Sequence, residues 1–124
     1  MTVKTFYSML FGRFDSEEFE RYLGELLSFS EASEKQLERR IAAYMVHVYL
    51  TEVAKEADEP GIEPAFALKD IYECPACIKH IAQVYLKGIM RGKDLLFGVK
   101  NPVNEEEAGQ IVARVRDKSQ RSWS

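Results

Sequence analysis

The stretch that decides the fold is Asp70–Gly92, which reads DIYECPACIKHIAQVYLKGIMRG. Pro75 suits the first turn of a helix, because the N–H that proline lacks would have no helical partner there. Apolar residues then recur at helical spacing, and Gly88 or Gly92 supplies the break that ends a helix. These apolar positions are Ile78, Ile81, Ala82, Tyr85 and Ile89. The stretch therefore predicts an amphipathic helix that begins at Cys74 and Pro75.

Other helices are indicated by capping boxes, in which a short polar residue precedes an acid or amide by three positions. Pairs of this kind include Asp15 with Glu18, Ser33 with Gln36, and Asn104 with Glu107. They predict a helix after Asp15, a long helix from Ser33 to about Ala57, and a helix after Asn104. Residues 2–11 add a short apolar helix, and no stretch alternates with the period of a strand. The predicted fold class is all-α, a small helical bundle of about five helices.

The bundle is expected to consist of two segments within one compact domain. An acidic stretch from Lys55 to Glu63 contains Pro60-Gly61 and predicts a linker. It separates an N-terminal helical segment, residues 1–60, from residues 61–124. The last residues, 117–124, form a polar tail that is expected to fray.

Composition excludes several functional classes. The chain has 124 residues, of which 46% are hydrophobic and 30% charged, and this composition is typical of one globular domain. The net charge of −3 provides no basic field for nucleic acid. The apolar run Ile41–Leu50 is far shorter than the roughly 20 residues that span a bilayer, so no membrane span is expected. Without a recognisable targeting segment, a cytoplasmic protein is expected, or a cell-surface protein if the sequence is a fragment.

A series of short motifs follows the order of a known module. Asp70-Ile71 precedes the predicted helix, Gly88-Ile89-Met90-Arg91-Gly92 ends it, and Phe97 lies in the loop that follows. Further along come Asn101-Pro102-Val103, Glu107 and Arg114-Val115. From Phe66 to Val115 the chain resembles the S-layer homology (SLH) module, a helix-loop-helix repeat. Residues 61–124 would then form one SLH-like repeat, and residues 1–60 would include a degenerate half repeat whose helix starts at Leu37-Glu38-Arg39-Arg40.

The resemblance implies a function and a set of ligand-binding residues. SLH repeats commonly bind secondary cell-wall polysaccharide, with an arginine from a Thr-Arg motif lining the groove. By this resemblance Arg39, Asp70 and Arg91 are candidate ligand-binding residues. The second helix has Glu105 where the family has its arginine, and a carboxylate there would repel an acidic glycan. We therefore expect a non-catalytic binding or assembly module. Its partners would be another protein, a second copy, or a wall polysaccharide.

The pair Cys74 and Cys77, followed by His80, permits three interpretations. In the simplest, reduced cysteines pack at the start of the helix, since a free cysteine behaves as a small hydrophobe. In the second, a thiol at a helix N-terminus has a lowered pKa, and the pair exchanges disulfides with help from His80. In the third, Cys74, Cys77 and His80 bind zinc in a helical adaptor, with His47 as the fourth ligand. Otherwise His47 is expected to be a core histidine, and no catalytic group is expected.

Overall fold

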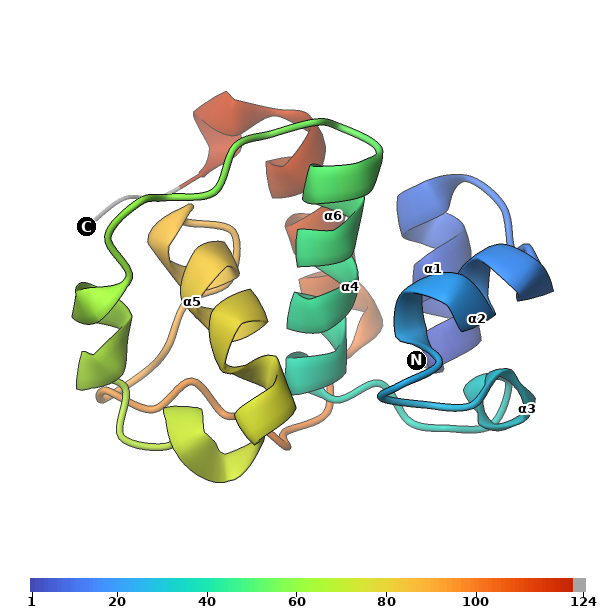
Figure 1. Ribbon diagram of the computed structural model, residues 1–124, viewed down its shortest axis with the longest axis horizontal. Coiled ribbons are helices and arrows are strands. Elements are labelled where there is room, and N and C mark those ends of the chain that lie inside the picture. Colours follow the sequence, from blue (N-terminus) through green and yellow to red (C-terminus); the bar gives the residue numbers. More distant parts are fainter. Residues whose placement is uncertain (122–124) are drawn as a thin grey trace.

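The computed structural model describes residues 1–121, with the side chain of Phe29 excepted. It has six α-helices within those residues: α1 Val3–Phe11, α2 Ser16–Leu23, α3 Phe29–Ala32, α4 Arg39–Glu52, α5 Ile78–Leu86 and α6 Glu105–Arg116 (Figure 1). Only isolated β-bridges occur in the described part, and they form no strand or sheet. The predicted all-α class is confirmed. No helix of residues 1–121 has the length and apolar character that crossing a membrane requires.

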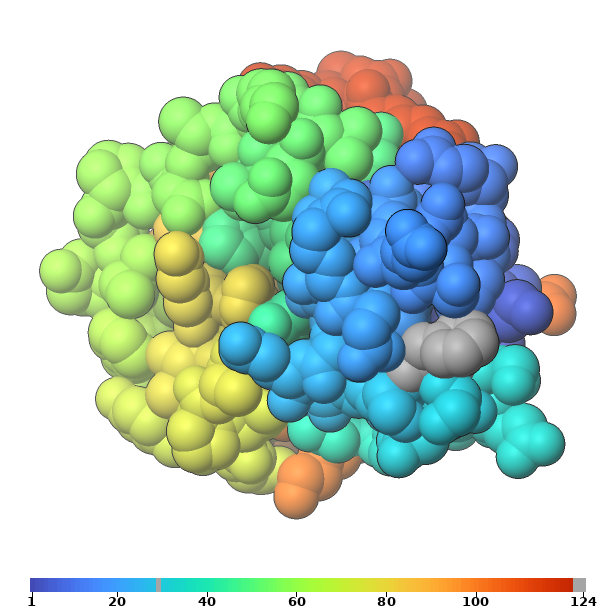
Figure 2. Space-filling view, turned by 45° about the vertical axis from the view of Figure 1, so that its right-hand side comes forward, coloured from blue at the N-terminus to red at the C-terminus, as the bar shows by residue number. Residues whose placement is uncertain are grey.

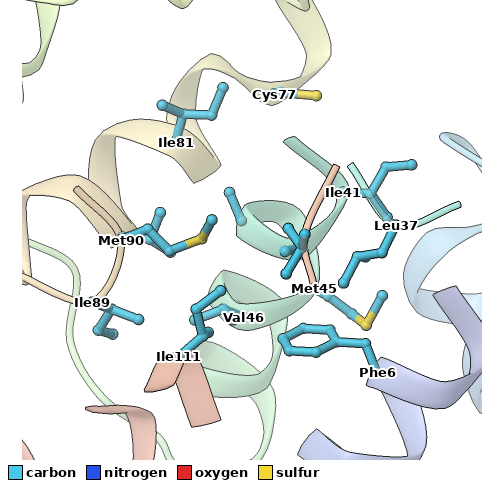
Figure 3. Packing of buried hydrophobic residues seen from close by; sticks show 14 of the residues in the cluster. Phe6, Leu37, Ile41, Met45, Val46, Cys77, Ile81, Ile89, Met90 and Ile111 are labelled. Carbon is cyan, nitrogen blue, oxygen red and sulfur yellow. The ribbon is translucent and has the colours of Figure 1, made fainter. Parts of the chain in front are cut away.

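Helix α4 is the centre of the bundle. Figure 1 shows it between α1 and α2 on one side and α5 on the other. Its buried side chains point in several directions: Ile41, Ala42, Ala43, Met45, Val46, His47 and Leu50. Burial of each large apolar side chain contributes roughly 1.5–3 kcal/mol. Figure 3 shows how Met45 and Val46 meet Phe6 of α1 and Ile111 of α6 in one continuous core.

The long helix predicted from Ser33 to Ala57 is wrong at both ends. Residues 36–38 are not helical, because they pair with two distant parts of the chain. Gln36 forms an antiparallel bridge with Thr2, and Glu38 forms one with Pro102. At the other end the helix stops at Glu52, and Lys55 has a left-handed φ of 56°. The predicted caps at Asp15 and Asn104 are correct, since each side chain accepts a backbone N–H of its own helix.

Helix α5 begins later than predicted, at Ile78. The preceding residues form two short 3₁₀ turns, Ile71–Glu73 and Pro75–Cys77. After the helix, Gly88 adopts a left-handed φ of 72°. A Cβ on Gly92 would lie 2.7 Å from the carbonyl oxygen of Leu96. Both glycines of the motif are therefore required by the backbone path.

The acidic stretch after α4 is packed against the bundle. Figure 2 shows this segment, in green, next to the yellow surface of α5. Its Glu56 carboxylate pairs with Lys87 at 2.9 Å and with Arg121 at 2.8 Å. The side chains of both cations are only 2% exposed. Arg121 thus holds the described part of the C-terminal tail in place, and residues 117–121 do not fray as expected; residues 122–124 lie outside the described residues.

Candidate functional site

The side chain of Asp70 holds the loop between α5 and α6 by hydrogen bonds. The Asp70 carboxylate accepts hydrogen bonds from the backbone N–H groups of Phe97 and Gly98 at 2.8 Å and of Val99 at 3.2 Å. Burial raises the pKa of Asp70, but the three N–H donors together lower it more, so the pKa lies below its ordinary value. The ionised carboxylate therefore fixes the shape of this loop.

The side chain of Arg39 also holds this loop by hydrogen bonds. Its Nε donates to the carbonyl oxygen of Phe97 at 2.8 Å, and its Nη2 donates to the carbonyl oxygen of Arg91 at 2.5 Å. Its Nη1 pairs with the carboxylate of Glu107 on α6. The guanidinium also lies 4.8 Å from the centre of the Phe97 ring, within cation–π range. Arg39 therefore connects the start of α4, the loop and the start of α6.

A groove of about 680 Å³ opens above these contacts, and we call it the 91–101 groove. All three residues that the SLH resemblance suggested for ligand binding, Arg39, Asp70 and Arg91, line it. Its other lining residues are Glu73, Gly92, Lys93, Asp94, Leu96, Phe97, Gly98, Val99, Lys100, Asn101, Pro102 and Glu107. The volume lies within the range of about 300–1,000 Å³ that is usual for small-ligand sites.

The charged residues of the groove are of two kinds: some are hydrogen-bonded to the loop, and others are exposed to solvent. Arg39 and Asp70 use their polar atoms on the loop, and Asp70 is only 8% exposed. Lys93, Asp94 and Lys100 are exposed at the rim. A ligand in the groove would therefore meet cations and carboxylates on a loop that is already rigid.

The two cysteines form a second site at the start of α5. They are joined by a disulfide with a Cα–Cα distance of 5.2 Å. Cys77 is fully buried, and Cys74 is 6% exposed. The guanidinium Nη1 of Arg40 lies 3.7 Å from the sulfur of Cys74.

His80 on α5, His47 on α4 and Asp58 form a hydrogen-bonded chain. Nδ1 of His47 lies 2.8 Å from Nδ1 of His80, and Nε2 of His47 lies 2.7 Å from Oδ1 of Asp58. The ring of Tyr44 packs 3.9 Å from that of His80, centre to centre. Burial, with smaller contributions from the neighbouring His47 and Lys79, lowers the pKa of His80 to about 4. His47 is 4% exposed, as expected for a core histidine.

The four residues suggested as zinc ligands occur as two pairs, Cys74 with Cys77 and His47 with His80. Cys74 and Cys77 carry no thiolate while they are bonded to each other. Within residues 1–121 no group of three or more His, Cys, Asp or Glu side chains is arranged to hold a metal ion. The hydrogen bonds of His47 are made to His80 and Asp58 instead.

Sequence reasoning missed three residues of this second site: Arg40, Tyr44 and Asp58. A signal for two of them existed, because Arg40, Tyr44 and His47 recur at i, i+4 and i+7 and so share one face of a helix. Asp58 had no such signal, since its position depends on how the stretch after α4 folds back.

Comparisons of the chain with protein-family models, curated proteins and solved structures find no match.

Proposed function

We propose that the chain is a binding module whose ligand occupies the 91–101 groove and is not chemically changed there. The observation that carries this proposal is the convergence of Arg39, Asp70 and Arg91 on one groove from separate parts of the sequence. The SLH resemblance suggested these residues from their motifs alone, and their common location supports that suggestion.

The rigidity of the groove is a further support. The backbone N–H of Arg39 donates to the carbonyl oxygen of Asn101, and that of Arg40 donates to the carbonyl oxygen of Val99, both at 2.9 Å. Together with the clamps of Asp70 and the Arg39 side chain, these bonds fix the loop before any ligand arrives. A preformed site loses less conformational entropy on binding, and this favours affinity.

The proposed ligand is a cell-wall polysaccharide. The residue that argued against an acidic glycan, Glu105, is not among the described residues that line the groove. Lys93 and Lys100 at the rim can donate to hydroxyl, carboxylate or phosphate oxygens, and Asp94 can accept from sugar hydroxyls. The groove thus offers both donors and acceptors, which a hydroxyl-rich chain requires.

A co-sedimentation assay with bacterial cell wall tests this function. The wall is prepared with and without its secondary polysaccharide, and the bound protein is measured at low and moderate salt. We expect retention only when the polysaccharide is present, with at least a fivefold loss in the Lys93→Ala/Lys100→Ala double variant. The control double variant Lys35→Ala/Lys79→Ala removes the same charge from residues that do not line the groove, and it should bind like the wild type. Absence of retention at low salt, or equal loss in both double variants, would overturn the proposal.

A protein partner or a second copy is the second candidate, and a surface beside the groove favours it. Phe66 and Tyr72 stack with their ring centres 6.0 Å apart, yet they are 39% and 64% exposed. Leu95 and Leu96 are also exposed, and the backbone N–H of Lys69 binds the carbonyl oxygen of Leu95. Exposed apolar side chains that gather in this way are typical of interaction surfaces. Light scattering decides the self-association form, and a monomer at all accessible concentrations would exclude it.

A further inference from the structure

One face of α4 lies against the start of α5 and carries polar residues. Arg40, Tyr44 and His47 recur at i, i+4 and i+7 along this face. Arg40 contacts the sulfur of Cys74, while Tyr44 and His47 contact His80. The disulfide with Arg40 and the histidine pair with Asp58 therefore lie along one face of α4, and none of these residues lines the 91–101 groove.

We propose that Cys74 and Cys77 are a redox-active pair that reduces external disulfides, with the Asp58–His47–His80 chain accepting the proton of Cys77. This activity is independent of ligand binding in the groove. The structure represents the oxidised product of the reaction, in which the two sulfurs are bonded.

The hydrogen-bonded chain defines the role of His80. The contact between His47 Nε2 and Asp58 requires a proton on Nε2, because a carboxylate only accepts. Nδ1 of His47 then accepts, so Nδ1 of His80 donates. Nε2 of neutral His80 is left as an acceptor, three residues after Cys77 on the first turn of α5. Residues at this spacing share a helix face.

The reaction starts from the dithiol form and proceeds in two steps. The Cys74 thiolate, next to the Arg40 guanidinium, attacks one sulfur of an external disulfide and releases the first external thiolate. The Cys77 thiol then gives its proton to Nε2 of His80 and attacks the sulfur of Cys74, releasing the second thiolate. The external disulfide gains two electrons and becomes two thiols. The protons come from Cys74 and Cys77, the latter through His80.

Burial and charge are consistent with this order. Cys74 is the less buried of the two residues, since it is 6% exposed and Cys77 is fully buried. Arg40 supplies the positive charge that stabilises a thiolate at Cys74. The titratable and charged groups that surround His80 are Tyr44 and His47 from α4, Asp58 from the stretch after α4, and Lys79 from α5 itself.

The test follows oxidation of the reduced protein, residues 1–124, by glutathione disulfide. The protein is reduced with dithiothreitol, and circular dichroism checks that its helices persist. Acid quenching and mass spectrometry then measure free thiols, mixed disulfide and internal disulfide between pH 6 and 9. In the wild type the mixed disulfide should be transient. In Cys77→Ser it should persist, with glutathione attached at Cys74.

The histidine variants separate a proton acceptor from a packing role. In His80→Gln the conversion of mixed to internal disulfide should slow at least tenfold, because general base catalysis typically contributes 10²–10⁴. Its dependence on pH should also become that of a free thiol. His47→Gln serves if His80→Gln does not fold, and Glu34→Gln is a surface control. Three results would each overturn the proposal: loss of helices on reduction, glutathione on Cys77 alone, or histidine variants whose rates and pH profiles equal those of the wild type.

Discussion

The Asp70→Asn substitution isolates the contribution of the Asp70 clamp. The amide keeps the size of the carboxylate but removes its charge and one acceptor oxygen. In the wild type one oxygen accepts from Phe97, and the other accepts from Gly98 and Val99. When the amide NH₂ takes the position of the second oxygen, its N–H groups face the backbone N–H groups of Gly98 and Val99. Two charge-assisted hydrogen bonds are then lost.

Each lost bond of this kind costs about 1.5 kcal/mol, so the free energy of unfolding should fall by about 3 kcal/mol. For a chain of this size that corresponds to a decrease in Tm of about 10 °C. The assay is thermal and urea unfolding monitored by circular dichroism at pH 7. Asp94→Asn is the matched control, since it makes the same change at an exposed residue of the same loop. Its φ of 55° suits asparagine, and its stability should stay within about 0.5 kcal/mol of the wild type.

Acid should remove the difference between wild type and Asp70→Asn. The folded-state pKa of Asp70 is lowered, so its stabilisation is complete above the ordinary pKa of an aspartate and is lost as pH falls through the lowered pKa. The two proteins should therefore converge in stability toward pH 2. A loss below about 1 kcal/mol at pH 7, or a gap that stays constant with pH, would refute the clamp.

Two further predictions concern the packing of the chain. Glu56→Ala removes the carboxylate of buried Arg121 and the nearer of the two carboxylates of buried Lys87, and it should cost about 3–5 kcal/mol, measured by urea unfolding at pH 7. Burial raises the pKa of Glu56, but its two cations lower it to about 2 overall, so this stabilisation is lost only as pH falls toward 2; an early loss near pH 5 would contradict it. Gly98→Ala should cost about 2 kcal/mol, because its φ is 80° and the new Cβ would lie 2.8 Å from the Asn101 amide. Gly12 has a φ of 82° but open space around it, so Gly12→Ala should cost only about 1 kcal/mol. Both variants are measured by differential scanning calorimetry, and equal losses of stability would count against the close approach at Gly98.

Local signals in the sequence were sufficient for part of the fold. The helix starts after Asp15 and Asn104 were predictable, because a cap involves only the first turn of its own helix. Ser33 and Gln36 gave the same signal and failed. Residues 35–38 pair with the N-terminus and with the loop before α6, and a local pattern contains no information on such distant partners.

The candidate site was likewise only partly predictable from local sequence. Asp70 and Arg91 were named as candidates from the sequence, and both line the same groove as Arg39, while ligand binding there stays a prediction. The internal use of Arg39 was not foreseeable, since its partners lie more than 50 positions away along the chain. The link from His47 to Asp58 likewise depends on how separate segments pack together.

The most direct test of the binding function is a map of the ligand on the folded protein. Backbone amide NMR spectra are recorded while a soluble fragment of secondary wall polysaccharide is added. The proposal predicts saturable shifts concentrated in residues 91–101 and at Glu73, which Lys93→Ala/Lys100→Ala weakens at least fivefold. Shifts confined to α1, α2 and α3, or an unchanged spectrum at millimolar fragment, would contradict it.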